Sequence, residues 1–261
     1  MKPKALILFA HGTNRDQDVA EALLLAGADP EVIPLNVLRE GQRRFGDYQM
    51  LVIPGGFSYA DALGAGRLLA IDLQSYFAEE IQEFVAAGKP VLGICNGFQA
   101  LVKSGILPGN EEFASEMARV TLTFNANGHF ECRWVTLRPV SQKCIWTKGL
   151  VDLIECPVAH GEGNFQVSDP SLLSVLSNFD QVALTYVFPD GSSAQGDYPA
   201  NPNGSGFDIA GITNLAGNVL GLMPHPENHI HFWQHPQWMR GVNQRSGLPL
   251  FENGVHYAAQ L

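Results

Sequence analysis

Apolar residues in the first half of the chain fall into two kinds of segment. Short unbroken apolar runs predict strands over residues 5–10, 50–53 and 90–94, and the run over 31–34, which begins with Glu31, predicts a weaker strand. Between these runs apolar residues recur at helical spacing, as at Val19, Ala22, Leu23 and Ala26 and again over 81–87. Strands without polar alternation are typical of a parallel sheet that is covered on both faces. The pattern therefore predicts an α/β fold with a doubly wound, mostly parallel sheet.

The second half has a different pattern, which predicts added antiparallel strands. Alternating residues over 119–124 and 129–136, joined by the turn-forming residues 125–128, indicate a β-hairpin. Further strands are expected over 182–187, 208–214 and 219–223, and the Gly-, Ser-, Asn- and Pro-rich stretch 190–205 is expected to be a long ordered loop. We expect residues 1–261 to form a single domain, because no repeat or low-complexity tract divides them.

Cys95 stands where the strand over 90–94 runs directly into a helix predicted over 96–104. Gly93 and Gly97 flank it and permit a tight backbone turn. At such a turn the sulfur lies beside the unpaired N–H groups of a helix N-terminus, which favour thiolate over thiol. Cys95 is therefore a candidate nucleophile, although a small buried hydrophobe also fits a single cysteine in an apolar segment.

Three loops should meet near Cys95, because ligands bind beyond the carboxyl ends of parallel strands. These loops cover residues 11–14, 54–58 and 95–97. Paired glycines in the second loop let a backbone N–H turn toward the site, where it would join the N–H of Asn96 in binding the oxyanion of a tetrahedral intermediate. An ordinary turn also uses paired glycines, so this feature alone does not decide the function.

Residues 223–227 read Met-Pro-His-Pro-Glu and follow a predicted strand. A thiol nucleophile needs a base, and the base needs a group that orients it. In extended backbone, residues two apart point to the same side, so Glu227 would hold one ring nitrogen of His225 while the other nitrogen faces a sulfur. A histidine in a proline-rich surface loop would give the same local sequence.

Composition excludes several classes of function. Acidic residues outnumber basic ones by 26 to 16, for a formal net charge of −10, so we expect no binding to nucleic acid. The chain has no apolar stretch of membrane-spanning length, and we expect a cytoplasmic protein without a membrane role. The cysteines form no Cys-x-x-Cys pair and are expected to be reduced, with Cys132, Cys144 and Cys156 structural.

No metal or nucleotide site is expected. Residues 160–163, His-Gly-Glu-Gly, lack a second ligand at metal spacing, and their glycines suit a close approach of the backbone to a small molecule. The chain also lacks a Gly-x-x-x-x-Gly-Lys-Ser/Thr phosphate loop. The tail over 229–238 is rich in histidine and tryptophan, which here favours a capping or partner-facing surface over a metal site.

Several motifs together resemble the glutamine amidotransferase components of phosphoribosylformylglycinamidine synthase, a branch of the class I, or triad, amidotransferases. They are Pro-Gly-Gly-Phe-Ser-Tyr at 54–59, Gly-Ile-Cys-Asn-Gly-Phe-Gln at 93–99, His-Gly-Glu-Gly at 160–163, Tyr-Pro-Ala-Asn-Pro-Asn-Gly-Ser at 198–205 and Met-Pro-His-Pro-Glu at 223–227. The Cys-x-Gly-x-Gln and His-Pro-Glu patterns resemble the whole class, and the others resemble this branch. The resemblance spans almost the whole chain and implies a flavodoxin-like class I amidotransferase fold.

The resemblance also implies a reaction, the hydrolysis of glutamine through a γ-glutamyl thioester with release of ammonia. In it, Cys95 would be the nucleophile, His225 the general base and acid, and Glu227 the orienting carboxylate. The remaining implied residues are Gly56 and Asn96 for the oxyanion hole and Gln99 and Gly161 for contacts with glutamine.

Partners and cofactors follow from the same resemblance. In this family the ammonia passes to a synthetase, which implies ATP and Mg²⁺ on that partner and no cofactor in this chain. The missing phosphate loop agrees with such a division. A small bridging subunit joins the two in some members, and others fuse both activities; this chain resembles the free-standing form, although its 198–205 motif and Trp-rich tail also resemble the terminal domain of the fused enzyme.

Three positions depart from the family pattern. Ala60 stands where Gly is usual, and Asn164 and Asn228 stand where Arg is frequent. Lost arginines near the site would change how the synthetase docks or how ammonia is handed over. Two other functions stay open: a self-sufficient cysteine hydrolase, such as a γ-glutamyl hydrolase or an intracellular peptidase, and a non-catalytic binding subunit that retains the fold.

Overall fold

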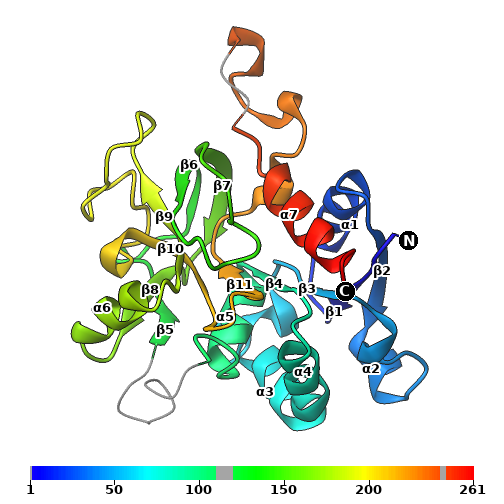
Figure 1. Ribbon diagram of the computed structural model, residues 1–261. Coiled ribbons are helices and arrows are strands. Elements are labelled where there is room, and N and C mark those ends of the chain that lie inside the picture. Colours follow the sequence, from blue (N-terminus) through cyan, green and yellow to red (C-terminus); the bar gives the residue numbers. More distant parts are fainter. Residues whose placement is uncertain (1, 110–119, 242–244) are drawn as a thin grey trace.

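The computed structural model describes residues 2–109, 120–241 and 245–261, and its largest element is a nine-stranded sheet (Figure 1). The strand order is β2-β1-β3-β4-β11-β10-β9-β6-β7, and β5 and β8 form a separate two-stranded sheet. From β2 to β11 neighbouring strands are parallel, and from β11 to β7 they are antiparallel. The expected α/β fold, with a parallel sheet extended by antiparallel strands, is confirmed.

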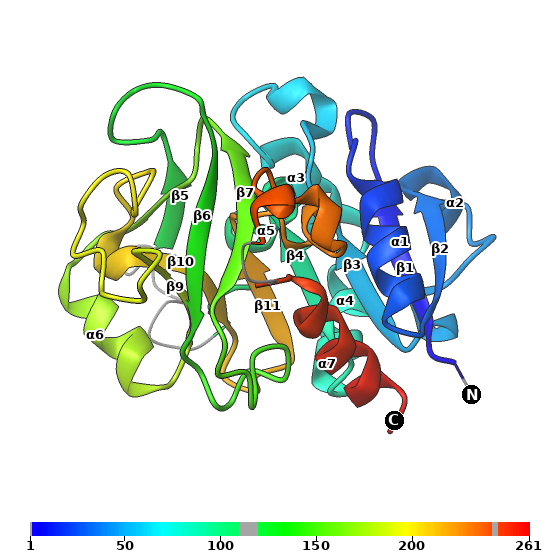
Figure 2. The same cartoon turned by 90° about the horizontal axis from the view of Figure 1, so that it is seen from above.

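The parallel half is built from βα units. Its strands are β1 (Lys4–Phe9), β2 (Asp29–Pro34), β3 (Met50–Ile53), β4 (Val91–Ile94) and β11 (Val219–Leu222). Its helices are α1 (Asp16–Leu25), α2 (Leu35–Arg39), α3 (Arg67–Tyr76), α4 (Ala78–Ala86), α5 (Asn96–Lys103) and α7 (Leu248–Ala258). The helices α1 and α7 pack together on one face of the sheet, and α3, α4 and α5 pack on the other (Figures 1 and 2).

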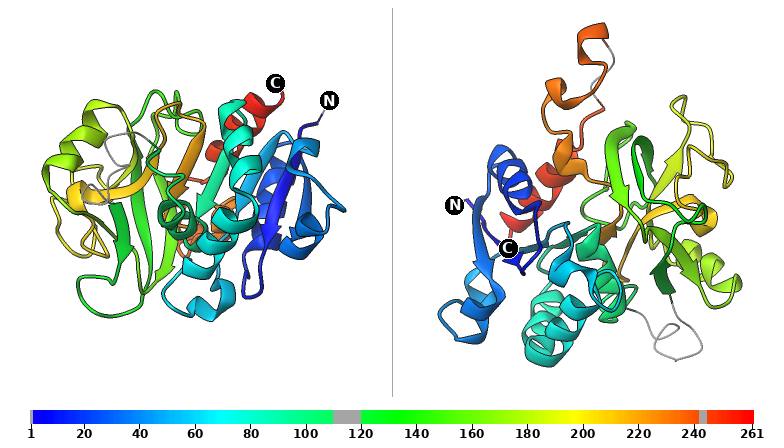
Figure 3. Two further views of the ribbon diagram at one scale, coloured as in Figure 1. Left: turned by 90° about the horizontal axis from the view of Figure 1, so that it is seen from below. Right: turned by 180° about the vertical axis from the view of Figure 1, so that it is seen from behind.

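The antiparallel half extends the sheet beyond β11. Its elements are β5 (Val120–Thr123), β6 (Glu131–Pro139), β7 (Ile154–His160), β8 (Asn164–Val167), α6 (Ser171–Asn178), β9 (Val182–Val187) and β10 (Ile209–Thr213). Strand direction alternates outward from β11, so β9 and β7 run the same way as β11. The end of β7 therefore lies at the edge where the parallel strands end. Both termini lie over the parallel half, and α6 lies at the opposite end of the molecule (Figure 3).

The predicted hairpin between the first two strands of the second half is wrong. The strand β5 pairs with β8, and β6 pairs with β7 and β9; Arg119, the first residue of the predicted hairpin, lies outside the described residues. The turn does form, because Gly128 N–H donates to the Asn125 carbonyl at 2.9 Å with a left-handed φ of 71° at Gly128. However, the N–H of Asn125 donates to Gly161 and the N–H of Ala126 donates to Asn203, so distant loops take the hydrogen bonds that a hairpin would use.

The loop over 190–205 is ordered by side chains, as expected for a long loop between strands. The carboxylate of Asp208 accepts hydrogen bonds from the N–H groups of Gln195 and Gly196 at 2.7 and 2.8 Å. The Asn201 amide also donates to Asp208, at 2.9 Å. One buried carboxylate thus satisfies backbone that has no sheet partner.

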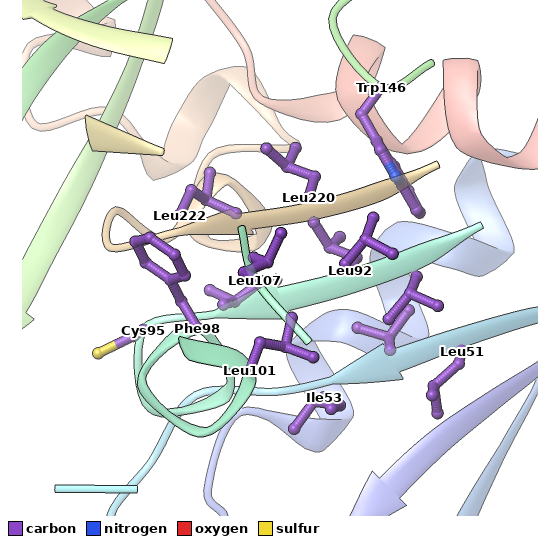
Figure 4. Packing of buried hydrophobic residues seen from close by; sticks show 14 of the residues in the cluster. Leu51, Ile53, Leu92, Cys95, Phe98, Leu101, Leu107, Trp146, Leu220 and Leu222 are labelled. Atoms are coloured by element: carbon purple, nitrogen blue, oxygen red, sulfur yellow. The ribbon is translucent and has the colours of Figure 1, made fainter. Parts of the chain in front are cut away.

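The core beneath the functional edge joins β4 and β11 to α5. Leu92 and Leu222 pack with Phe98 and Leu101, and all of these side chains are buried. In Figure 4 the sulfur of Cys95 points away from this apolar cluster at the joint between β4 and α5. Within the described ranges no helix is long and apolar enough to cross a membrane.

Candidate active site

Cys95 occupies a strained joint between strand and helix. Its φ and ψ are 50° and −103°, whereas neither Gly93 nor Gly97 has a positive φ. The glycines are needed for space: a Cβ on Gly97 would lie 1.9 Å from the Ile53 carbonyl oxygen, and one on Gly93 would lie 2.9 Å from the Gly97 backbone. The unusual conformation therefore falls on Cys95 itself, as in a nucleophile elbow.

His225 and Glu227 meet as predicted but through a different backbone path. His225 Nδ1 lies 2.7 Å from Glu227 Oε1, and both side chains are buried. Residues Pro226–Asn228 form a short 3₁₀ turn rather than extended chain, because Pro226 has the fixed φ of a helix start and the Asn228 N–H donates to the His225 carbonyl at 3.1 Å. Glu227 Oε2 has no hydrogen-bond partner among the described residues, so the contact of Oε1 with His225 is the carboxylate's hydrogen bond there.

The charge state of His225 is set by its two neighbours. Burial lowers its pKa, but the Glu227 carboxylate and the hydrogen-bonded Cys95 sulfur raise it to about 10. The imidazole therefore holds a proton at neutral pH, with Nδ1 directed to Glu227 and the other nitrogen available to the sulfur. The structure brings Cys95 together with His225 and Glu227, which lie about half of the chain away in the sequence.

The loop after β3, residues 54–58, contains Gly55 and Gly56 and packs against Cys95 and His225, which together are called the dyad below. Gly56 forms a bridge with Thr13, and the Phe57 N–H donates to the Gly12 carbonyl at 2.9 Å, so the loops after β1 and β3 are joined. A Cβ on Gly55 would lie 2.6 Å from Cε1 of His225 and 3.5 Å from Cβ of Cys95. The loops expected to converge on Cys95 do so, and Gly55 contacts the dyad more closely than sequence reasoning indicated.

The residues predicted to touch glutamine, Gln99 and Gly161, contact or belong to the 160–163 loop, which follows β7. The Gln99 side chain is buried and donates from Nε2 to the Glu162 carbonyl at 2.7 Å, so it holds the 160–163 loop. Gly161 is half-buried, and its carbonyl accepts the Asn125 N–H at 2.9 Å. The sulfur of Cys95 lies 3.8 Å from the Ala159 carbonyl oxygen, so the end of β7 reaches the thiol directly.

Buried amides hold the 160–163 loop from behind. Asn125 Oδ1 lies 3.1 Å from His160 Nδ1 and accepts the Gly163 N–H at 3.0 Å. Asn203 Nδ2 lies 3.4 Å from His160 Nε2 and donates to the Tyr186 hydroxyl at 3.1 Å. Burial, assisted by the nearby charge of His225, lowers the pKa of His160 to about 4. His160 is therefore a neutral structural group at pH 7.

The positions that depart from the family pattern make local contacts. Ala60 has a left-handed φ of 55°, which explains why glycine suits this position. Asn164 accepts a hydrogen bond from Gln166 at 2.7 Å, and Asn228 donates to Asp18 at 3.0 Å. None of them lies in the Cys95–His225–Glu227 set.

The histidine-rich tail packs partly against the sheet. His229 and His235 flank the ring of Trp134 with centroid distances of 5.1 and 4.7 Å, and His235 Nε2 lies 3.3 Å from Glu155. Beyond them Phe232, Trp233 and Trp238 are about half exposed. In the part of the chain that the structure describes, no group of three metal-ligating side chains is placed to hold an ion.

Sequence reasoning missed the side chains that support the site. The local sequence predicts only a turn for Asn125, and the motif over 198–205 predicts no role for Asn203. Ser58 and Asp61 also bind site residues from the loop after β3. The signal for these residues is their place inside or next to the recognised motifs, but their partners are distant in sequence and cannot be derived from local spacing.

Comparisons with known proteins identify the family of this chain. A family model described as a CobB/CobQ-like glutamine amidotransferase domain matches residues 2–258. A Treponema denticola protein named phosphoribosylformylglycinamidine synthase subunit PurQ is 52% identical, with 98% of this chain and 99% of that protein covered. A PurQ subunit of Dehalococcoides mccartyi is 42% identical over 100% of this chain and 99% of its own.

A solved structure gives the same result. The chain superposes on a chain of the structure titled PurLQS from Thermotoga maritima with a TM-score of 0.74 and 31% identity, covering 98% of this chain and 99% of that one. A Thermotoga maritima glutamine amidotransferase at 15% identity and a TM-score of 0.56 shares the fold. The chain therefore belongs to the glutamine amidotransferase family that includes the PurQ subunits of phosphoribosylformylglycinamidine synthase.

Proposed function

We propose that this chain is the glutaminase subunit of a phosphoribosylformylglycinamidine synthase and that Cys95, His225 and Glu227 perform its chemistry. The observation that carries the proposal is the buried arrangement of the three side chains. His225 is hydrogen-bonded to the Cys95 sulfur, and its Nδ1 lies 2.7 Å from Glu227 Oε1. The family assignment supplies the substrate, glutamine, and the neighbouring loops supply candidate groups for each step.

The first step is attack of the Cys95 sulfur on the side-chain carbonyl carbon of glutamine. A carbon–sulfur bond forms, and the carbonyl oxygen gains the negative charge. His225, whose pKa is raised to about 10, then donates its proton to the leaving nitrogen, so that ammonia departs and a γ-glutamyl thioester remains. Water, deprotonated by the now neutral His225, hydrolyses the thioester and releases glutamate.

The oxyanion is bound by the backbone N–H groups of Gly56 and Asn96. Asn96 is the first residue of α5, so its N–H has no partner within the helix, and it directly follows the nucleophile. Gly56 follows Gly55, which lies against the His225 ring. We assign Gln99 and Gly161 to the glutamine pocket, Gln99 by holding the 160–163 loop and Gly161 by its backbone.

The remaining parts of the proposal concern the complex. The related PurQ protein of known structure was solved in a PurLQS assembly, so we propose that this chain delivers ammonia to a synthetase subunit, with a small third subunit in the complex. ATP and Mg²⁺ would act on the synthetase, and this chain would need no cofactor. We also propose that residues 1–261 work as one domain in the cytoplasm.

The decisive experiment replaces the nucleophile. In the complex with its synthetase, Cys95→Ala is expected to lower glutamine-dependent amidine synthesis by about 10³-fold or more, because no thioester can form. Synthesis from added ammonia should be unchanged. Cys132→Ser, at an exposed thiol, is the matched control and should retain both activities.

Other outcomes identify other functions. Glutamine-dependent synthesis that survives Cys95→Ala would falsify the proposed mechanism. Strong peptidase or γ-glutamyl hydrolase turnover by the isolated chain would identify a self-sufficient hydrolase instead. An unreactive Cys95 toward glutamine-like electrophiles, together with ammonia-only synthesis by the wild type, would identify a non-catalytic subunit.

A further inference from the structure

The loop between β3 and α3 has an uncommon backbone path. Tyr59, Ala60, Asp61 and Leu63 have φ values of 54°, 55°, 52° and 65°, all in the left-handed region. Each such residue other than glycine costs about 1 kcal/mol or more, and a run of them persists only where surrounding contacts fix it. The contacts that fix this loop therefore identify what the strain serves.

Tyr59 is held by Asp72 and by the His11 carbonyl, whereas Ser58 and Asp61 meet at one side chain, the amide of Asn96. Asn96 Oδ1 accepts the Ser58 N–H at 3.1 Å and the Ser58 hydroxyl at 2.5 Å. Asn96 Nδ2 donates to Asp61 Oδ1 at 2.9 Å and to Gln99 Oε1 at 3.0 Å. Because an amide side chain has two donors and two acceptor positions, the hydrogen-bonding capacity of Asn96 is filled, and the residue is buried.

This amide connects two segments whose relative position matters for the reaction. Asn96 directly follows Cys95, and its backbone N–H is one proposed oxyanion donor. Ser58 lies two residues after Gly56, whose N–H is the other proposed donor. The hydrogen bonds between Asn96 and Ser58 therefore tie the two donor segments directly to each other, and Asp61 accepts a further hydrogen bond from the same amide.

The nucleophile and base are held by different contacts. The Cys95 N–H donates to the Leu222 carbonyl at 2.8 Å, and the His225 N–H donates to the Pro157 carbonyl at 2.8 Å. Neither bond involves Ser58 or Asp61. Loss of the Asn96 anchor should therefore loosen the oxyanion hole and leave the reactive thiol in place.

We propose that Ser58 and Asp61 are positioning residues that align the two halves of the oxyanion hole through the side chain of Asn96. This inference rests on the proposed glutaminase function of the same site. The geometry required of oxyanion donors is narrow, so a small displacement of either N–H weakens stabilisation of the charged carbonyl oxygen. Ser58 and Asp61 therefore do not stabilise the uncharged carbonyl of bound glutamine. Their contribution arises in the transition state, when the carbonyl oxygen carries negative charge.

The test compares two reactions of the same sulfur. Alkylation of Cys95 by iodoacetamide forms a carbon–sulfur bond and expels iodide without a tetrahedral oxyanion, whereas glutamine hydrolysis passes through one. Variants are assembled with the synthetase and assayed for glutamine-dependent synthesis, for ammonia-dependent synthesis and for alkylation at Cys95. Alkylation is followed on the Cys95 peptide by mass spectrometry, because the thiol of Cys132 is exposed and would react as well.

Asp61→Ala is expected to lower kcat with glutamine by about 10- to 100-fold, less than full removal of an oxyanion donor, with KM changed by less than about threefold. Ser58→Ala, which removes the hydroxyl but keeps the backbone donor, should lower kcat by about three- to tenfold. Asp61→Asn keeps an acceptor oxygen and should recover most of the loss. Alkylation at Cys95 and ammonia-dependent synthesis should stay at the wild-type rate in all three variants.

The controls separate the possible failures. Asp190→Ala removes an exposed carboxylate that binds Ser192 in a distant loop and should change none of the readouts. Equal losses of alkylation and glutamine use would show that the loop merely supports the fold, and unchanged kcat in Asp61→Ala and Ser58→Ala would also overturn the inference. If Asp61→Ala does not fold, Ser58→Ala and Asp61→Asn decide the matter. A wild-type protein that uses glutamine no better than Cys95→Ala would instead refute the proposed function itself.

Discussion

The two halves of the sheet reach the same edge by different means. In the parallel half each βα unit delivers a loop to this edge, and Cys95 sits directly at the end of β4. In the antiparallel half only alternate strands end there, and long loops must fill the gap between them. The side chains of Asn125 and Asn203 therefore hold the 160–163 loop, at Gly163 and His160, whereas backbone ladders hold the parallel strands.

This difference separates two kinds of support. The reacting groups Cys95 and His225 lie at strand ends, whose backbone is held by neighbouring strands, and small shifts there change the chemistry. The 160–163 loop is held by buried amides, so a change in one amide should affect stability first and turnover second. The two halves should thus respond differently to substitutions of similar size.

Among substitutions that leave the reacting groups themselves unchanged, the largest expected effect is that of Gly55→Ala in the parallel half. The new Cβ would lie 2.6 Å from Cε1 of His225, and the ring has little room to move because it is buried against Cys95 and Glu227. We expect glutamine-dependent kcat/KM to fall by about 100-fold or more, since displacement of a catalytic base by a fraction of an ångström is costly. Steady-state kinetics of the complex measure this effect.

Gly46→Ala is the matched control for this substitution. Gly46 lacks a positive φ, and a Cβ there would meet nothing within 4 Å. It should leave kinetics unchanged. Wild-type kinetics in Gly55→Ala would mean that the loop after β3 lies farther from the dyad during turnover than it does in this structure.

The same division explains what the sequence could reveal. Unbroken apolar runs locate β3, β4 and β11, and the Gly-x-Cys-x-Gly and His-Pro-Glu patterns identify Cys95 and His225, because these signals are local. The pairing of β5 with β8 was missed, since the turn at 125–128 forms but its hydrogen bonds go to Gly161 and Asn203. The support from Ser58 and Asp61 depends on a loop in which Tyr59, Ala60 and Leu63 are left-handed, a conformation that these residue types rarely adopt.

In the antiparallel half the largest effect should be on acid stability, through His160. The pKa of this residue is about 4 in the folded protein and about 6.5 when unfolded. The unfolded state therefore binds the proton more readily below pH 6.5, so stability falls as the pH drops from 6.5 toward 4, by up to about 3 kcal/mol from this group.

Urea unfolding of the chain between pH 4 and 7 tests this contribution. His160→Gln should flatten the pH dependence of the unfolding free energy, even though it lowers stability at pH 7 by removing hydrogen bonds. His129→Gln, at an exposed histidine, should leave the slope unchanged. A slope that is the same in His160→Gln and wild type would assign the acid sensitivity to other groups.

A smaller effect is expected for Asn203→Ala, which removes a partner of the buried Tyr186 hydroxyl. The unsatisfied hydroxyl should lower the unfolding free energy by about 2 kcal/mol, and glutamine turnover should fall by less than about tenfold. In a Tyr186→Phe background the stability loss should shrink by about 1 kcal/mol, because the orphaned hydroxyl is absent. Equal losses of unfolding free energy in both backgrounds would show that the Tyr186 hydroxyl does not depend on Asn203. A fall in glutamine turnover as large as that of Gly55→Ala would show that the two halves of the sheet respond alike to substitution.

The smallest effect belongs to the parallel half again, at Ala60. Its left-handed φ of 55° costs an alanine about 1–2 kcal/mol, and glycine would regain this but lose about 0.5–1 kcal/mol through its freer unfolded chain. Ala60→Gly should therefore raise the unfolding free energy by about 0.5–1 kcal/mol without changing kcat, as measured by urea unfolding and kinetics. Ala87→Gly, at an exposed position with a φ of −70°, should lower it instead, because only the entropic loss applies there. Destabilisation by both substitutions would mean that the path around Asn96 imposes no strain on Ala60.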